Sequence, residues 1–492
     1  MCSVLRTILM KLIYERTYSK VDQTMTDAQI GARRKKSVRN HIFILNSIIT
    51  DVTGSVNKES VDLNVMDYKQ MFDSEDLVTV LNAMYEAEVT DDMFALMYEA
   101  NETTYFKIKT PNGVTEIEEM KNKILQGDVL APMLSSNMVD KNIGLEALKS
   151  QNVYMYKNTV VIPPLMMQDD TLGISKCGYK SRKMKKILNT RTNIMGLQYG
   201  KLKCEKMHIG KKQMNKDCCV DFEVDSWSDT LVKNVKNVVV LEDTYSGKEK
   251  NKVVEDKKYL WEIISCDGGN KKNFKEKTDR AIGNVNNIVS SLHERPYGKH
   301  SYIAASIMRD AMLLGAMLCN AESWINITEA DLTRLQKPDT MLQKELLSAS
   351  GNPSNAFMSL ELGFIPVKYV IIYKRMTFLH YILSESTESM IRKVYTALKR
   401  DSRRGDFYHL VVKDMKDLDI IFNEEDISSH TYNQWKKYIK SRVYDLSLKN
   451  LVLENATKEK TKHIKFSQMK MAEYLKQNRN SQITKVIFAI RS

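Results

Sequence analysis

Apolar residues recur at helical spacing through the first hundred residues, with one segment that reads as a strand. The pattern predicts helices over Val4–Tyr14, Val38–Ile49, Asp76–Glu86 and Asp91–Asn101, and a strand over Val61–Met66. Alternation predicts another strand over Thr104–Thr110, which turns at Pro111-Asn112-Gly113 into Val114–Ile117. A helix is expected from Val129 towards Ser150. This order of strands and helices indicates a mixed α+β fold.

Two adjacent carboxylates, Asp169 and Asp170, lie between two apolar segments. The run Val160–Met167 precedes them and Leu172–Ile174 follows, which predicts a β-hairpin with the acids at its turn. Neighbouring carboxylates disfavour each other's ionisation unless a cation lies between them, and oxygen ligands suit Mg²⁺. Because Asp-Asp is also common in solvated hairpin turns, the pair alone leaves a metal site and an ordinary turn both open.

An acidic stretch upstream supplies a third candidate ligand. Asp67 directly follows the strand predicted over Val61–Met66, and Phe72 comes five residues later. One carboxylate from this strand and a pair from the hairpin could clamp two divalent ions. Two such ions can activate a 3′-hydroxyl and stabilise a pyrophosphate leaving group during in-line phosphoryl transfer.

Three segments, in order, resemble the A, B and C motifs of reverse transcriptases. They are Asp67-x-x-x-x-Phe72-Asp73, then Gln126-Gly127-Asp128-Val129-Leu130-Ala131-Pro132, then Gln168-Asp169-Asp170. The surrounding residues resemble non-LTR (LINE-type) retrotransposon enzymes, with Met167 where that family usually has an aromatic residue. The resemblance implies a right-hand polymerase with partial fingers, a split βαβ palm and a helical thumb, followed by a mainly helical C-terminal extension.

The resemblance implies roles for the acids and the aromatic residue. Asp67, Asp169 and Asp170, with the backbone carbonyl of Tyr68, would ligate two Mg²⁺ ions, for which Mn²⁺ could substitute. Phe72 would be a steric gate whose ring excludes a ribose 2′-hydroxyl and so selects deoxynucleotides.

Contacts to nucleotide and template are implied in the same way. Gln126 and Gly127 would help to hold the nucleotide and the template. In the fingers, the residues that would contact the template are Gln29, Gly31 and Arg33. Lys203, with Lys201 in reserve, would protonate the pyrophosphate in motif D, although a surface charge is an equal reading. The segment Lys258–Gly269 resembles the primer-grip hairpin, with Trp261 where the family usually has glycine; the indole would strain the turn or fill a gap.

Composition and charge suit a nucleic-acid partner inside the cell. The chain has 492 residues, a formal charge of +13 and a pI near 9.1, which favours a polyanion. Its seven cysteines show neither disulfide nor zinc spacing, which indicates a reducing compartment. Charged residues interrupt the most apolar segments, Tyr302–Cys319 and Phe364–Leu383, so we expect buried helices, no membrane segment and no secretion, with the protein in the nucleus or cytoplasm.

Helical patterns dominate the second half of the chain. Thumb helices are expected over Asp279–Leu292, Ser301–Cys319 and Glu329–Ala349. The expected domains are partial fingers at 1–60, a palm with finger elements at 61–276, a thumb at 277–350 and a basic helical extension at 351–492. Relative to the family, a basic finger residue upstream and a zinc motif downstream are missing, so we expect a chain truncated at both ends.

The sequence thus predicts an RNA-directed DNA polymerase of a non-LTR retroelement. Its partners would be an RNA template, a DNA primer, dNTPs and the element's own RNA. A catalytically inactive nucleic-acid-binding remnant is the alternative, because of the missing finger residue, Trp261 and the absent zinc motif. A maturase-like splicing cofactor is a third, weaker reading.

Overall fold

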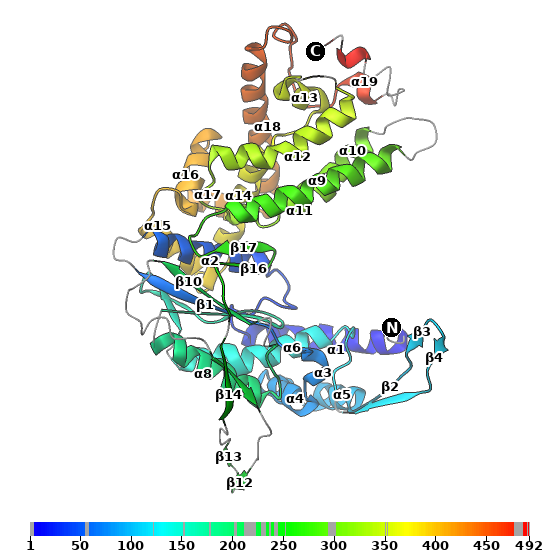
Figure 1. The fold of residues 1–492 in the computed structure, drawn as a ribbon, viewed down its shortest axis with the longest axis vertical. Helices are drawn as coiled ribbons and strands as arrows, with labels where there is room; N and C mark the ends of the chain where they lie inside the picture. Colours follow the sequence, from blue (N-terminus) through cyan, green and yellow to red (C-terminus); the bar gives the residue numbers. More distant parts are fainter. Residues whose placement is uncertain are drawn as a thin grey trace. The chain divides into compact units, whose positions relative to one another are not determined.

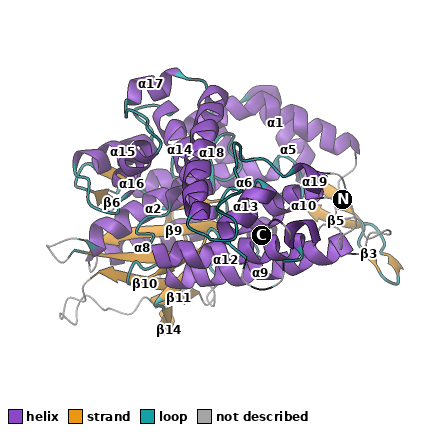
Figure 2. Cartoon of the chain, turned by 90° about the horizontal axis from the view of Figure 1, so that it is seen from above, coloured by secondary structure: helices purple, strands orange, loops and turns teal. Residues whose placement is uncertain are grey.

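The computed structural model describes residues 4–54, 59–121, 123–150, 153–176, 179–200, 204–210, 223–227, 233–235, 238–240, 245–250, 252–293, 302–349, 351, 353–476, 486–489 and 491. It divides into two units, Met1–His41 with Ile48–Lys257, and Ile42–Ser47 with Lys258–Ser492. Both combine helices with strands or a hairpin, so the chain is a mixed helical and β protein (Figures 1 and 2).

A five-stranded sheet forms the centre of the first unit. Its order is β15 (Lys252–Val253), β10 (Glu205–Gly210), β1 (Ser60–Met66), β9 (Asp170–Lys176) and β8 (Leu165–Met167). The central strand β1 pairs antiparallel with both β9 and β10. Every residue of Val61–Met66 is buried, as expected for a strand covered on both faces. The strand predicted at this position is therefore confirmed.

Helices make up much of the rest of residues 4–194, and the middle of one of them, α2, belongs to the second unit. They are α1 (Val4–Thr24), α2 (Val38–Thr53), α3 (Met71–Ser74), α4 (Leu77–Glu86), α5 (Asp91–Glu102), α6 (Ala131–Val139), α7 (Leu145–Lys149) and α8 (Tyr179–Ile194), with a π-helical turn η1 (Asp140–Gly144) between α6 and α7. Helix α1 runs ten residues past the predicted end at Tyr14, because Met10, Ile13, Thr17 and Val21 continue one buried stripe.

Short hairpins complete the first unit. They are β2 (Thr103–Phe106) with β5 (Glu118–Lys121), β3 (Lys109–Thr110) with β4 (Gly113–Val114), β6 (Tyr154–Tyr156) with β7 (Val160–Ile162), β11 (Glu223–Trp227) with β14 (Tyr245–Lys250), and β12 (Lys233–Val235) with β13 (Val238–Val240). The predicted run Val160–Met167 is thus two strands, β7 and β8, which belong to different sheets. Pro163 and Pro164 lie between them, and proline has no N–H to donate to a strand ladder.

The second unit begins with a hairpin and continues as helices. These are β16 (Asp256–Tyr259), β17 (Glu262–Ser265), α9 (Lys271–His293), α10 (Tyr302–Met308), η3 (Arg309–Leu314), α11 (Gly315–Met317), η4 (Ala321–Ser323), α12 (Glu329–Leu347), α13 (Asn355–Leu362), α14 (Val367–Ser384), α15 (Met390–Arg400), α16 (Phe407–Asp417), α17 (Glu424–Ser429), α18 (Tyr432–Ala456) and α19 (Glu473–Lys476). Capping boxes at Thr328 and Thr431 start α12 and α18.

One core holds the expected thumb and the expected extension together. Phe274, Trp324 and Leu342 pack in the same buried cluster as Phe357 and Leu475. A thumb ending at residue 350 therefore shares its core with the helices of the extension. No single described helix is apolar and long enough to cross a membrane; α13 and α14 reach that length and composition together, but are bent by 59° at the break between them.

Candidate functional site

The acidic hairpin forms as predicted and lies beside the end of β1. Met167 pairs with Asp170 in the β8–β9 hairpin, so Gln168 and Asp169 make a two-residue turn, with Gln168 at φ 57°. The last pair of β1 with β9 joins Met66 to Thr171. Asp67 directly follows Met66 and Asp170 directly precedes Thr171, so each of these acids is next in the chain to one partner of this last pair. Asp67, Asp169 and Asp170 are each only partly buried.

The segment around Gln29 is hydrogen-bonded to the acidic hairpin. Ala28 O accepts a hydrogen bond from Met166 N at 2.8 Å, and Met166 O accepts one from Ile30 N at 2.9 Å. The Gln29 Oε1 atom accepts from Gly31 N at 2.8 Å and from Gln168 N at 3.2 Å. Gln29 is fully buried, so the structure corrects the expected template contact: its side chain holds the hairpin instead.

Gly31 and Arg33 are likewise committed to protein contacts. A Cβ on Gly31 would lie 2.6 Å from Gln168 N, which leaves no room for a side chain. Arg33 is 6% exposed and donates to the Asp22 carboxylate at 2.7 Å and to the Thr26 carbonyl at 2.6 Å. The expected template contact of Arg33 is corrected as well, because neighbouring groups of the same segment enclose its guanidinium.

The other side of Asp67 is fixed by the segment before β10. Gly200 N donates to Asp67 O at 2.8 Å and Lys69 N donates to Gln198 O at 2.8 Å, around a bridge between Tyr68 and Tyr199. In this bonding pattern the carbonyl of the residue between the two bonds points to the opposite side of its strand. The Tyr68 carbonyl is therefore directed away from Tyr199, while the two rings stack at 5.1 Å.

Phe72 lies on the one-turn helix α3, after Gln70 at φ 48°. Its side chain is partly buried, while Glu75, just beyond α3, is fully buried and accepts a hydrogen bond from Ser135 Oγ at 2.6 Å. Burial and, to a smaller extent, the nearby negative charge of Asp169 together raise the pKa of Glu75 to about 7. A protonatable acid thus lies within electrostatic reach of the acidic turn, which the sequence pattern did not single out.

The motif B turn is exposed, and the motif D lysine is outside the described residues. Gln126 and Gly127 form a turn with Gly127 at φ 85°, a conformation that glycine adopts readily. The next residue, Asp128, anchors the turn by accepting from Arg6 Nε at 2.8 Å. Lys203 cannot be placed, because residues 201–203 lie outside the described part of the chain.

The donor set at this end of the sheet suits a hard divalent cation by its chemistry. Asp67, Asp169, Asp170 and the Tyr68 carbonyl offer oxygen atoms only, which Mg²⁺ prefers. Across the described residues, however, no three or more His, Cys, Asp and Glu side chains are grouped closely enough to hold a metal ion. The type of donor atom suits the predicted site, whereas among the described residues the carboxylate groups are not gathered around one point.

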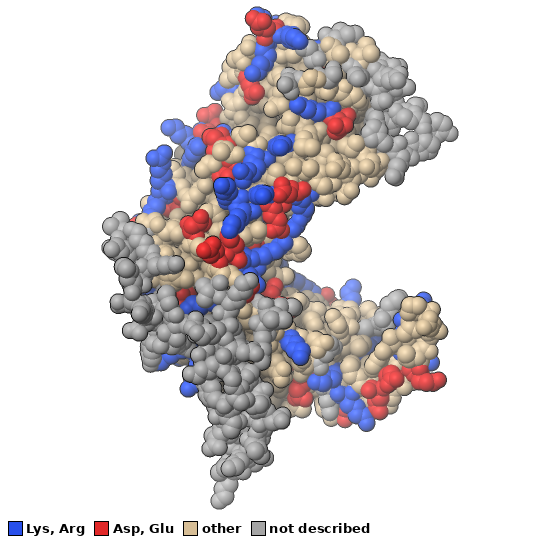
Figure 3. Space-filling view, in the orientation of Figure 1, with Lys and Arg blue, Asp and Glu red and all other residues tan. Residues whose placement is uncertain are grey.

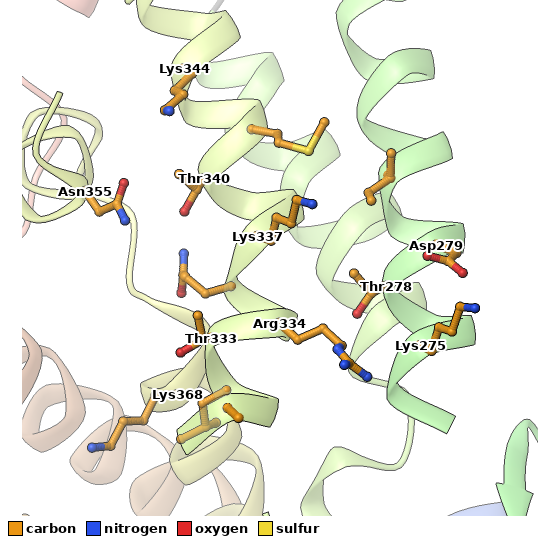
Figure 4. A pocket seen from close by; sticks show the side chains of 15 residues that line it. Lys275, Thr278, Asp279, Thr333, Arg334, Lys337, Thr340, Lys344, Asn355 and Lys368 are labelled. Atoms are coloured by element: carbon orange, nitrogen blue, oxygen red, sulfur yellow. The ribbon is translucent and has the colours of Figure 1, made fainter. Parts of the chain in front are cut away.

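A basic groove of about 920 Å³ lies between α9 and α12 in the second unit (Figure 4). Its cations are Lys275, Arg334, Lys337, Lys344 and Lys368, and its one acid is Asp279. Within the described chain, none of the five is within ion-pair distance of a carboxylate. Lys and Arg gather over this face in Figure 3. Such unpaired charge favours a polyanion.

Sequence reasoning missed this groove. Arg334, Lys337 and Lys344 recur at intervals of three and seven residues, which places them on one face of α12. That spacing was available as a signal, but Lys275 and Lys368 join the face from α9 and α14, far away in the chain.

The predicted primer-grip hairpin forms between β16 and β17, with an unusual turn. Leu260 and Trp261 have φ of 44° and 71°, a left-handed conformation that disfavours residues other than glycine. The Trp261 side chain is 60% exposed and Lys258 Nζ lies 5.7 Å from its ring. The indole therefore fills no gap, and the turn is strained.

Comparisons with known proteins find no matching family model and no matching curated protein. Among solved structures, the chain is similar to apo telomerase from Candida tropicalis, with a TM-score of 0.37 and 9% identity over 83% of this chain and 61% of that chain. It is also similar to telomerase from Candida albicans in complex with a TWJ fragment of telomeric RNA, with a TM-score of 0.31 and 10% identity over 89% of this chain and 56% of that one. The chain thus spans less than two thirds of either structure's length. Similarity this low is no evidence for an activity or a substrate.

Proposed function

We propose that this chain is an RNA-directed DNA polymerase of a non-LTR retroelement. The observation that carries the proposal is the pairing of β1 with β9, whose last pair, Met66 and Thr171, is adjacent in the chain to Asp67 and Asp170, with Asp169 in the adjoining turn. Acids in a polymerase-like order along the chain thereby come to one end of one sheet. The substrates would be a DNA primer, dNTPs and an RNA template, including the element's own RNA.

In this proposal, each residue near the acidic hairpin has one task. Asp67, Asp169 and Asp170, with the Tyr68 carbonyl, would hold two Mg²⁺ ions, which would lower the pKa of the primer 3′-hydroxyl and neutralise charge on the triphosphate. Phe72 would exclude a ribose 2′-hydroxyl by steric clash. The turn at Gln126 and Gly127 would hold the nucleotide, and Lys203 would supply the proton to the pyrophosphate.

The groove between α9 and α12 would bind the phosphate backbone of the primer–template duplex. Five cations facing one groove can release counterions from as many phosphates, which makes binding weaker as salt rises. A nucleic-acid-binding protein without turnover is the second candidate. Two observations favour this second candidate: among the described residues the carboxylates are not grouped around one point, and the turn at Trp261 is strained and exposed.

Primer extension separates the two candidates. The purified chain is assayed on an oligo(dT)-primed RNA template with Mg²⁺ or Mn²⁺, beside Asp169→Asn and, as a matched control, Asp92→Asn at an exposed position on α5. The proposal expects metal-dependent synthesis that falls about 100-fold or more in Asp169→Asn alone, because one charged ligand is lost without a change in volume.

Binding supplies the other measurement. Duplex affinity is measured between about 50 and 200 mM salt. The steepness of the plot of log affinity against log salt concentration should fall by about 1 in Lys337→Gln. Salt-dependent binding by folded protein, with no synthesis under any metal condition, would refute the polymerase proposal and support the binding protein. Full activity of Asp169→Asn would refute the assignment of the metal ligands.

A further inference from the structure

A second cavity of the helical unit, of about 430 Å³, is lined by tyrosines. It lies among η3, the segment between α13 and α14, α14 and α18, and it shares no lining residue with the basic groove. Tyr369, Tyr373 and Tyr444 contribute rings to its wall. Its size is within the range of pockets that take small molecules. We call it the tyrosine pocket.

The tyrosines are held in place and kept neutral. The Tyr369 hydroxyl accepts a hydrogen bond from Asn450 Nδ2 at 2.8 Å. Burial, with a smaller contribution from the nearby phenols of Tyr432 and Tyr444, raises the pKa of Tyr373 to about 12. The three phenols thus lie near one another and carry no charge at neutral pH.

Two lysines lie between two aromatic rings along one face of α18, and the face reaches this pocket at Lys440 and Tyr444. Tyr432, Lys436, Lys440 and Tyr444 follow one another every four residues, so they form one row on the helix. Lys436 Nζ lies 5.9 Å from the Tyr432 ring and Lys440 Nζ 5.6 Å from the Tyr444 ring. Rings beside cations are the means by which proteins bind unpaired bases and their phosphates.

The charges inside the pocket are mixed, which narrows the choice of ligand. Lys374, Lys440 and Arg309 line it, together with Asp310, which is 67% exposed. Arg309 already pairs with Asp339, and Lys374 lies 3.5 Å from Glu322. Asp310 accepts a hydrogen bond from Arg309 Nη1 at 3.2 Å, so Arg309, Lys374 and Asp310 all have charged partners in the protein. Lys440, beside the Tyr444 ring, is the cation that a ligand phosphate would meet. An apolar ligand would make no use of this lysine and a bare anion would make no use of the rings, whereas a nucleotide uses both, through its phosphate and its flat base.

The tyrosine pocket and the basic groove meet at the start of α14. Lys368 lines the groove and the next residue, Tyr369, lines the pocket. The wall between them contains Asp339, which accepts hydrogen bonds from Arg309 on the pocket side and from Gln336 on the groove side. Both cavities therefore border the first turn of α14.

We propose that the tyrosine pocket binds a single unpaired nucleotide, with its base stacked on Tyr373 or Tyr444 and its phosphate beside Lys440. The base would donate from its amino groups to Asp310. The nucleotide would come either from a nucleic-acid strand that continues out of the groove or from free mononucleotide. This binding does not depend on polymerase activity, because neither the acidic hairpin nor a metal takes part.

The test uses the full chain and two RNA duplexes that differ at one position. One carries a single bulged 2-aminopurine and the other pairs that position, and affinity and 2-aminopurine fluorescence are measured for both. We expect tighter binding and a fluorescence change for the bulged duplex. Tyr444→Ala should weaken that binding about 5- to 150-fold, while Tyr444→Phe retains it, because stacking needs the ring and not the hydroxyl. Binding of AMP and of GMP alone is measured in parallel.

Each outcome decides one point. A preference for the bulge that depends on the Tyr444 ring assigns the pocket to an unpaired nucleotide of a strand. Ring-dependent binding of AMP or GMP, without that preference, assigns it to free nucleotide. Equal binding of both duplexes by all variants, with no binding of AMP or GMP, overturns the proposal. If thermal melting shows that Tyr444→Ala is unfolded, the exposed Lys440→Gln replaces it, with the same expected loss for the bulged duplex only.

Discussion

Replacing Gly31 by alanine tests whether the Gln29 segment holds the acidic hairpin in place. The new Cβ would lie 2.6 Å from Gln168 N, 2.7 Å from Gln168 Cγ and 2.9 Å from Gln29 Oε1, whereas ordinary contact begins at 3.4 Å. Two of these three atoms belong to the turn residue next to Asp169, so the turn has to move or the Gln29 segment has to withdraw.

The size of the effect can be worked out from this overlap. A methyl group forced into a packed site costs about 1–3 kcal/mol of stability. If the turn moves by a few tenths of an ångström or more, the carboxylates of Asp169 and Asp170 move with it, and a misplacement of about 1 Å can cost about 100-fold in rate. Gly31→Ala should therefore lose both stability and primer extension.

Urea unfolding and primer extension measure the two losses separately. Gly283→Ala is the matched control, since Gly283 is exposed in the middle of α9 and a Cβ there would meet nothing within 4 Å. Alanine should stabilise that helix by about 0.5–1 kcal/mol. Equal stability and extension of Gly31→Ala and the wild-type chain would refute the supporting role given to this segment.

Two further predictions concern the turn at Trp261 and the buried acid Glu75. Trp261→Gly should raise the free energy of unfolding by up to about 1 kcal/mol, measured by thermal or urea unfolding. A left-handed tryptophan costs about 1–2 kcal/mol, and part of the gain from removing it is lost to the higher unfolded-state entropy of glycine. A variant less stable than the wild-type chain would contradict the strain assigned to this turn. Glu75 has a folded-state pKa of about 7 against an ordinary 4.5, so the folded chain holds the extra proton, and stability should fall as pH rises from about 4.5 to 7. Glu75→Gln should remove that part of the pH dependence. If the free energy of unfolding depends on pH identically in both proteins, the raised pKa of Glu75 is excluded as its cause.

Much of the secondary structure was readable from local pattern. The strand at Val61–Met66 and the acids at the turn after Met167 are where the alternation predicted them, because a hairpin depends on residues close together in the chain. The apolar run Val160–Met167, expected to lead into the acidic turn, does so only through β8, because Pro163 and Pro164 supply no N–H groups to a ladder and separate β7 from β8.

Only the tertiary structure decided which polar residues face solvent. Gln29 and Arg33 sit in a polar, basic stretch that resembles a template contact, yet both are enclosed because the segment docks on the acidic hairpin. The sequence alone determined that acids stand at the end of a strand and at a turn, since spacing and turn chemistry are local. The pairing of β1 with β9, which brings the end of one strand beside the acidic hairpin, depends on contacts between distant segments, and so does the gathering of cations from α9, α12 and α14 into one groove; no local pattern records either.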